Sequence, residues 1–233
     1  MAVIDFHAHI LPGIDDGSRS YEMTAQMLRA AKKQGIDTIV ATPHFYAESM
    51  RIRRFLDERQ SIVSKVEEQA RQEGIHVVCG AEVAFFSGMA KAEGLERLQI
   101  EDTNLLLLEL PFRSWSAHEL KEIDALLRRG FHPIIAHLER FYPFQTDRKV
   151  LSALLDMPVV VQLNAECLLH WKTRRRALRL FQNGQAQLLG SDCHNVSRRP
   201  ENLGEARAVL EQKMGKRFLN DMDAFGTSLL GME

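Results

Sequence analysis

The chain has 233 residues, and its 30 Lys and Arg residues nearly balance 31 Asp and Glu residues, which gives a formal net charge of −1. This balance excludes the long-range positive field of a protein that binds nucleic acid or an anionic membrane through its overall charge. No stretch reaches the roughly 18 apolar residues of a membrane-spanning helix, and no secretory signal is recognisable. The three cysteines are scattered along the sequence and do not indicate a disulfide framework. The basic run at residues 172–179 has helical spacing and is interpreted as the solvated face of a helix. We expect a soluble, cytoplasmic protein that neither inserts into a membrane nor binds nucleic acid.

Seven short runs rich in Val, Ile and Leu alternate with segments of helical period, a pattern typical of βαβ units around a parallel sheet. The predicted strands cover residues 3–7, 38–42, 76–82, 105–110, 133–137, 159–164 and 187–192. No linker and no internal repeat divides the sequence. We therefore expect a single domain over residues 1–233.

The segments between the predicted strands carry signals for the start and the end of helices. Ser20 is the predicted N-cap of a helix that ends at Gly35, and the next apolar stripe ends at Gly74. Ser116 and Glu119 form the S-x-x-E pattern of a capping box at the start of a third helix. The remaining predicted helices cover residues 148–155 and 173–183.

Seven parallel strands separated by helices can form an open doubly wound sheet or close into a barrel of the TIM type. The residues at the strand ends distinguish the two, because nearly every predicted strand ends beside a polar or metal-competent side chain. These side chains are His7, His9, His44, Glu82, Glu109, His137, Asn164, Asp192 and His194. A barrel brings all strand ends to one mouth, whereas an open sheet gathers only those at its switch point. We predict an α/β fold that closes as a TIM-like barrel.

The pattern of histidines and carboxylates predicts a multinuclear metal site. His7 and His9 share one face of the first strand, and Asp192 and His194 repeat this spacing at the last. Converging imidazoles and carboxylates would repel one another or lack partners unless cations lay between them. Such ligands suit Zn, Fe or Mn, and their number indicates two or three ions, with Glu82 or Glu109 as a bridge. Spacing alone does not choose between the adjacent Asp15 and Asp16 as a further ligand.

Two arginines point to a phosphorylated substrate. Arg140 follows the fifth predicted strand and Arg199 follows the seventh. Guanidinium groups bind phosphate in a bidentate manner, so this pattern favours phosphoester hydrolysis in which metal-activated water supplies the nucleophile. Residues 193–199 also match the C-x5-R pattern of cysteine-dependent tyrosine phosphatases. That loop lacks glycine, and Cys193 lies between two predicted ligands and so points away from them, which argues against a thiol nucleophile.

The segments HAHILPGIDDG, ATPH, GAEV, LLELP, IAHLER and GSDCHN, in this order, resemble the polymerase and histidinol phosphatase (PHP) superfamily. Within it, the sequence is most similar to the branch of bacterial protein-tyrosine phosphatases encoded with capsule and exopolysaccharide synthesis. The resemblance implies a distorted seven-stranded (β/α)7 barrel with a trinuclear site. It places His7, His9, Glu82 and Asp192 on one metal, Glu82, Glu109 and His137 on a second, and Asp16, His44 and His194 on the third. It selects Asp16, leaves Asp15 as a bystander, and matches Arg140 and Arg199 to the arginines of the phosphate site.

The resemblance also implies a substrate. This would be phosphotyrosine on the Tyr-rich tail of a membrane-associated autokinase of polysaccharide assembly. Mn or Fe is the expected metal, and Zn or Co accepts the same ligands. The aromatic residues Phe45, Tyr46, Phe112 and Trp115 either line a pocket for the phenol ring or pack in the core.

The sequence is also compatible with three alternatives to a metal-dependent tyrosine phosphatase. One is a PHP-type phosphatase of small molecules such as histidinol phosphate. Another is an amidohydrolase, which shares the His-x-His pair but usually has eight strands and a bridging lysine where this sequence has Glu109. The third is a non-catalytic metalloprotein that only binds a phosphorylated tail. The oligomeric state is not predicted.

Overall fold

The computed structural model describes residues 2–232, in which strands and helices alternate. The strands are β1 (Ile4–Ala8), β2 (Thr38–Ala41), β3 (His44–Phe45), β4 (His76–Cys79), β5 (Glu82–Ala84), β6 (Leu105–Glu109), β7 (His132–Ile135), β8 (Val160–Asn164) and β9 (Leu188–Gly190). The α-helices are α1 (Tyr21–Lys33), α2 (Ile52–Gln72), α3 (Ala117–Arg128), α4 (Arg148–Leu155), α5 (Glu166–Leu169), α6 (Trp171–Gln182), α7 (Leu203–Met214) and α8 (Lys216–Leu229). Short 3₁₀ helices are η1 (Met89–Lys91), η2 (Leu95–Leu98) and η3 (Leu138–Phe144).

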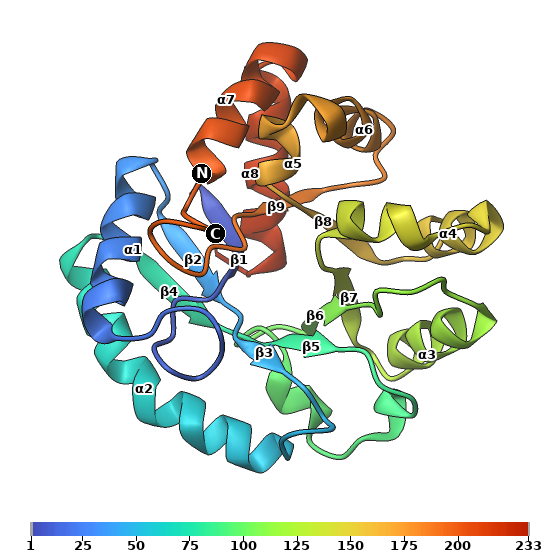
Figure 1. Ribbon diagram of the computed structural model, residues 1–233, viewed down its shortest axis with the longest axis horizontal. Coiled ribbons are helices and arrows are strands. Elements are labelled where there is room, and N and C mark those ends of the chain that lie inside the picture. The colour runs from blue at the N-terminus through green and yellow to red at the C-terminus, as the bar shows by residue number, and fades with distance from the viewer. Residues whose placement is uncertain (1, 233) are drawn as a thin grey trace.

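The strands pair in parallel and form two sheets, ordered β1-β2-β4 and β3-β5-β6-β7-β8-β9. The two sheets meet where β1 lies beside the end of β9. There the Asp192 N–H donates a hydrogen bond to the His7 carbonyl (2.7 Å), and the His9 N–H donates one to the Cys193 carbonyl (2.9 Å). The result is a curled parallel sheet with helices around its outside (Figure 1). The predicted α/β class with parallel βαβ units is confirmed.

Strand period divides the apolar residues between two clusters. In β6, Leu106 and Leu108 pack in the large cluster that contains the buried faces of the helices. Leu105 and Leu107 pack instead with residues such as Ile134 of β7 in a smaller cluster. Because successive strand residues point to opposite faces, Glu109 continues the Leu105 and Leu107 face. The Glu109 carboxylate therefore follows Leu105 and Leu107 on the same buried face of β6.

The helix signals in the sequence correspond to observed caps. The Ser20 side chain accepts a hydrogen bond from the N–H of Met23 at the start of α1. At α3, Ser116 and Glu119 form the predicted capping box. Helix α4 has the predicted bounds, and α6 begins two residues before the predicted start. Helices α7 and α8 were not predicted, and neither has a side-chain hydrogen bond at its N-cap.

Within residues 2–232, none of the helices combines the length and the apolar character that crossing a membrane requires.

Candidate metal centre

The side chains predicted as metal ligands gather where the strands end. His7, His9, Glu109, His137, Asp192 and His194 lie at or just after the ends of β1, β6, β7 and β9, His44 and Glu82 open β3 and β5, and Asp16 lies in the loop after β1. Each of these nine side chains lies within 3.6 Å of another member of the set. We call them the His-carboxylate cluster. All are buried except Asp16, which is 69% exposed, and His44, which is partly buried.

Glu82 is the centre of the cluster. Its Oε2 atom lies 3.1 Å from His7 Nε2, 3.3 Å from His9 Nε2 and 2.9 Å from His44 Nδ1, while Oε1 lies 2.8 Å from His137 Nε2. Despite these short distances, the buried atoms Glu82 Oε2 and His44 Nδ1 have no hydrogen-bond partner among the residues that the structure describes. Both atoms are therefore available as ligand atoms. This donor set fits cations held between the side chains.

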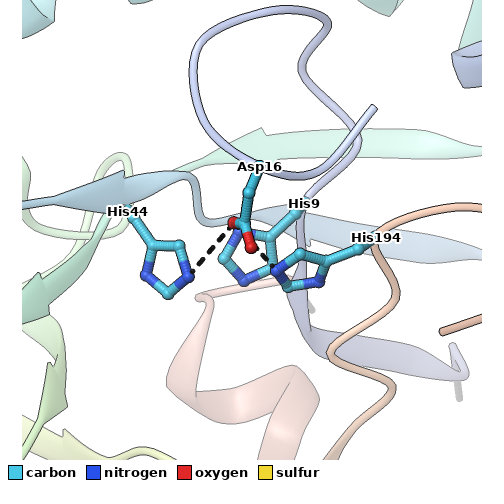
Figure 2. A group of neighbouring side chains, drawn as sticks. All are labelled: His9, Asp16, His44 and His194. Atoms are coloured by element: carbon cyan, nitrogen blue, oxygen red, sulfur yellow. Dashed lines mark ion pairs between the residues drawn. The ribbon is translucent and has the colours of Figure 1, made fainter. Parts of the chain in front are cut away.

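A second group of donors surrounds Asp16 (Figure 2). The loop after β1 carries Asp16 across His9, so that the carboxylate lies between His44 and His194. Asp16 Oδ1 is 3.6 Å from His44 Nε2 and 3.3 Å from His194 Nε2. One donor atom from each of these four side chains lies within 4.8 Å of the others. The loop thereby adds a solvent-facing carboxylate to three imidazoles.

The remaining carboxylates of the cluster, Asp192 and Glu109, each lie beside different imidazoles. Asp192 Oδ1 lies 3.6 Å from His7 Nε2 and 3.3 Å from His9 Nε2. Glu109 Oε1 lies 3.5 Å from His137 Nε2. The geometry therefore brings together each of the three ligand groups that the family resemblance implies.

Two residues of the cluster have unusual backbone conformations. His137 and Asp192 have φ angles of 31° and 54°, in the left-handed region that residues other than glycine seldom adopt. The His137 N–H donates to Gln162 Oε1 (2.8 Å), and the Asp192 N–H donates to the His7 carbonyl. Such strain persists where the surrounding contacts over-determine the conformation, which is common at functional sites.

Burial and charge act in opposite directions on the pKa values of the cluster. Burial lowers the pKa of His9, but hydrogen bonds with the surrounding carboxylates raise it well above its usual value overall. Burial also opposes protonation of His137, yet adjacent carboxylates raise its pKa to about 10. For Glu82 and Asp192, burial raises the pKa, and neighbouring imidazoles lower it further than that, to well below the usual value. The imidazoles and the two carboxylates thus stabilise one another's charged forms, and the space around Glu82 and Asp192 favours positive charge.

Two buried amide side chains on β8 contact ligand side chains of the cluster. Gln162 Oε1 lies 3.3 Å from His7 Nδ1, and the Gln162 amide donates to Asn164 Oδ1 (3.0 Å). The Asn164 amide then donates to Asp192 Oδ2 (2.7 Å). Sequence reasoning noted Asn164 but missed Gln162, although their i, i+2 spacing on one strand face was the available signal. The pair orients ligands from both β1 and β9.

The interpretation of Asp15 as a bystander is wrong. Asp15 Oδ2 accepts a hydrogen bond from His9 Nδ1 (2.7 Å) and another from the backbone N–H of His44 (3.0 Å). The Gly17 N–H donates to Asp15 Oδ1 (2.9 Å). Burial raises the pKa of Asp15, but the hydrogen bond and charge of His9 lower it overall to about 2. Asp15 therefore holds the His9 ring with Nε2 directed toward Glu82 and Asp192.

We expect Asp15→Asn to weaken metal binding by about 10- to 100-fold, the usual cost of losing a carboxylate that orients a metal-binding histidine. Elemental analysis after dialysis at graded metal concentrations measures this effect. Asp57→Asn, an exposed change on α2, is the matched control. Unchanged metal affinity with a lowered melting temperature would instead make Asp15 a purely structural residue.

Arg140 and Arg199 lie beside the cluster, as predicted. Both reach Asp192 Oδ2, Arg140 Nη1 at 3.4 Å and Arg199 Nη2 at 2.5 Å. They line a hollow of about 520 Å³ that also includes Asp192 and Asn164. Each guanidinium remains more than one third exposed, so it can turn toward an anion in the hollow.

The four candidate aromatic residues divide into two kinds. Phe45 and Trp115 are buried and pack in the core, against Phe55 and Phe141 respectively. Tyr46 and Phe112 are 45% and 42% exposed. Tyr46 stacks on His44 with a centroid distance of 5.3 Å, and Phe112 stacks on His137 at 6.1 Å. Tyr46 and Phe112 therefore flank the cluster, and each offers an apolar ring face.

Cys193 is unsuited to act as a nucleophile. The residue is 2% exposed, and its N–H is bound by Ser191 Oγ. Burial, followed by the negative charge of Glu201 and Asp5, raises the pKa of its thiol well above the usual value. Since the thiolate is the reactive form, the geometry agrees with the expectation that Cys193 does not attack the substrate.

Comparison with known proteins identifies the family. Residues 3–225 match the family described as capsular polysaccharide synthesis, CpsB/CapC. The chain belongs to the CpsB/CapC family. It is 30% identical over 226 residues to the tyrosine-protein phosphatase YwqE of Bacillus subtilis, a match that covers 93% of this chain and 87% of that protein. The family predicted from the motifs is thus confirmed.

Solved structures place this CpsB/CapC chain among related folds. It superposes with a TM-score of 0.82 and 27% identity on a structure from the work on YwqE of Bacillus subtilis and CpsB of Streptococcus pneumoniae, described as unique metal-dependent tyrosine phosphatases. That match covers 99% of this chain and 95% of the other. The phosphotriesterase homology protein of Escherichia coli matches with a TM-score of 0.58 and 12% identity over 95% of both chains, which shows a shared fold.

Proposed function

We propose that this protein is a metal-dependent protein-tyrosine phosphatase. The observation that supports this function most directly is that three imidazole nitrogens lie within 3.3 Å of Glu82 Oε2 and form no hydrogen bond with it. Two arginines next to these groups reach Asp192. CpsB/CapC membership and the tyrosine phosphatases YwqE and CpsB among its relatives support the substrate class. They favour this function over hydrolysis of small phosphates such as histidinol phosphate.

The residues present fit a cofactor of two to three metal ions. We propose His7, His9, Glu82 and Asp192 as ligands of one ion, Glu82, Glu109 and His137 as ligands of a second, and Asp16, His44 and His194 as ligands of a third. Nitrogen–oxygen distances of 2.8 to 3.6 Å within each group and the unpartnered buried atoms support this assignment. Nitrogen and carboxylate ligands suit Mn or Fe, and also Zn or Co. When bound, such ions lower the pKa of water and neutralise charge on phosphoryl oxygens.

The remaining side chains have separate roles in the proposed reaction. Arg140 and Arg199 bind the phosphoryl oxygens and keep the phosphorus beside Asp192. Tyr46 and Phe112 hold the substrate ring against their exposed faces. The leaving tyrosyl oxygen has a pKa of about 10, lower than that of an alkyl alcohol, so the reaction needs less help from a protonated side chain.

We further propose that residues 1–233 form one domain, closed as a distorted seven-stranded barrel. The backbone ladder between β2 and β4 continues into β3 and β5, since the Gly80 N–H donates to the Ala41 carbonyl and the Glu82 N–H to the Pro43 carbonyl. This continuity supports counting β2 with β3, and β4 with β5, as two bent strands. The proposed substrate is the phosphorylated Tyr-rich tail of a membrane-associated autokinase. We place the enzyme in the cytoplasm, where its free cysteines stay reduced.

The deciding experiment compares hydrolysis of a phosphotyrosyl peptide and of histidinol phosphate by the purified protein, with and without a chelator. We expect preference for the peptide, loss of activity on chelation and recovery on addition of Mn²⁺. The Cys193→Ala variant is expected to keep its rate within about twofold because the buried thiol takes no part in the proposed chemistry.

Other outcomes exclude the proposal. Activity that survives chelation but disappears in Cys193→Ala would establish a thiol mechanism. A preference for histidinol phosphate would indicate a small-molecule phosphatase. Absence of hydrolysis by protein whose metal content is full by elemental analysis would indicate a binding protein.

A further inference from the structure

A basic groove extends from the metal centre across the surface formed by η3, α4 and α6. The lining of the hollow beside Asp192 includes three arginines, Arg140, Arg198 and Arg199, together with Pro143 and the two carboxylates Glu139 and Glu166. Pro143 also lines a second hollow, of about 590 Å³, together with Tyr142, Arg148 and Arg176. The shared proline makes the two hollows neighbours. We use the name basic groove for Tyr142, Pro143, Arg148, Arg176 and Arg198.

Two of the three arginines of this groove stack on an aromatic ring, and none of the three has an anionic partner among the described residues. Arg176 and Arg148 lie over the Tyr142 ring, with distances of 4.7 and 5.6 Å from the guanidinium carbon to the ring centroid. Among residues 2–232, no carboxylate lies within ion-pair distance of Arg148, Arg176 or Arg198. Stacking on a ring leaves the N–H groups at the guanidinium edge free to bind oxygen anions.

This positive charge is a local feature of the molecule. The chain as a whole has a net charge of −1, so the groove does not follow from a generally basic surface. The basic run 172–179 was interpreted as the solvated face of a helix, and Lys172, Arg175, Arg176 and Arg179 are exposed on α6. The exposed Arg176 also lies over the Tyr142 ring, and Arg174, which is only partly exposed, donates hydrogen bonds to the carbonyls of Leu168 and Leu169. Helix α6 thus presents an ordered positive edge to the groove.

We propose that the basic groove binds acidic side chains of the substrate that flank its phosphotyrosine. This inference rests on the proposed function and specifies the substrate as an acidic phosphotyrosyl peptide. The groove begins at Arg140 and Arg199, the proposed phosphate ligands, so a peptide whose phosphotyrosine occupies the metal centre has a continuous path along it. Asp, Glu or a second phosphotyrosine then pairs with Arg198, Arg148 and Arg176. The groove adds affinity and selects the peptide without taking part in bond cleavage.

A peptide fits this surface better than a lipid bilayer does. Trp171 is 77% exposed at the start of α6 and lies near Lys172, a combination found on membrane-binding faces. The arginines, however, line concave hollows that are continuous with the metal centre. An extended chain can follow such hollows, whereas a bilayer surface contacts protruding groups.

The test uses two phosphotyrosyl peptides that differ only in their flanks, Asp and Glu in one, Asn and Gln in the other. We expect the wild-type enzyme to prefer the acidic peptide by about three- to tenfold in kcat/KM, as two or three exposed ion pairs would give. The preference should shrink as salt rises. In the Arg148→Gln/Arg176→Gln variant, where only Arg198 of the groove arginines remains, it should fall to about twofold or less, with turnover of the neutral peptide unchanged. Arg71→Gln/Arg217→Gln, with the same charge change at exposed sites on α2 and α8, should keep the preference.

The neutral peptide separates this inference from the proposed function, because its hydrolysis reports the metal centre alone. Equal turnover of both peptides by the wild type would overturn the docking role. Equal losses on both peptides in the groove variant, or the same loss of preference in the control variant, would also overturn it. Sedimentation with phosphatidylserine vesicles tests the lipid alternative. Vesicle binding that disappears in the groove variant, while peptide preference stays, would make the surface a membrane site instead.

Discussion

Glu82→Gln is expected to lower the rate of phosphotyrosyl peptide hydrolysis by about 10³-fold or more. Glu82 is the carboxylate shared by the imidazoles of His7, His9, His44 and His137. Glutamine keeps the size of the side chain but removes its negative charge, so it cannot bridge two cations. Loss of several kcal/mol of electrostatic stabilisation in the transition state corresponds to a rate loss of this size. Elemental analysis of the variant should also show fewer bound metal ions per chain.

The matched control for this variant is Glu68→Gln, which makes the same change at an exposed position of α2. It should retain wild-type rate and metal content. Thermal unfolding should show Glu82→Gln still folded, because glutamine keeps the volume of the buried side chain and leaves no cavity. A variant with full metal content and a rate within tenfold of wild type would contradict the role of Glu82 as a bridge.

The strand ends could be predicted because two local rules point to the same place. Period-two alternation puts His7 and His9, and likewise Leu107 and Glu109, on one face of their strands. Parallel βαβ connections then bring the ends of different strands together. Neither rule needs the identity of the surrounding residues. The convergence of residues as distant in sequence as His7 and Asp192, 3.6 Å apart, follows from them.

The role of Asp15 could not be predicted because it depends on the path of a loop. The chain after β1 folds back so that the Ser18 N–H donates to the His9 carbonyl. Gly17 permits this turn, since a Cβ atom there would lie 2.4 Å from that carbonyl oxygen. The fold-back directs Asp15 inward to His9 and leaves Asp16 facing solvent between His44 and His194. Sequence spacing has no period in such a loop, so it could not assign two adjacent aspartates to two different roles.

Other features depend on contacts between distant segments. The spacing of Gln162 and Asn164 indicates only that they share a strand face, and the positions of His7 and His137 show which side chains Gln162 contacts. The groove arginines resemble the charged face of any surface helix until η3 places Tyr142 beneath them. For Gln162 and Arg176 the informative neighbours, His137 and Tyr142, are more than 20 residues away, beyond the range of helical or strand periodicity, whereas Arg148 reaches Tyr142 through the local turn between η3 and α4.

Arg199→Gln is expected to lower kcat/KM for the phosphotyrosyl peptide by about 100-fold and to weaken inhibition by inorganic phosphate by about tenfold, while metal content stays unchanged. The Arg199 guanidinium lies 2.5 Å from Asp192 Oδ2 and is 38% exposed, so it can bind phosphate while it still neutralises this carboxylate. Arg199→Lys should recover only part of the loss, because an ammonium group lacks the planar fork.

Arg140→Gln should have a smaller effect than Arg199→Gln. Its guanidinium lies farther from Asp192, at 3.4 Å, and is partly held over the Phe112 ring at 5.1 Å. Steady-state kinetics with the neutral peptide should therefore rank Arg199 above Arg140, and Arg217→Gln should match the wild type. Loss of metal from Arg199→Gln would contradict the proposed role of Arg199 as a phosphate ligand. It would show that the arginine stabilises Asp192 as a metal ligand rather than binding the phosphoryl group. Equal losses in Arg140→Gln and Arg199→Gln, with metal retained, would instead indicate that the two guanidinium groups clamp the phosphate as one unit.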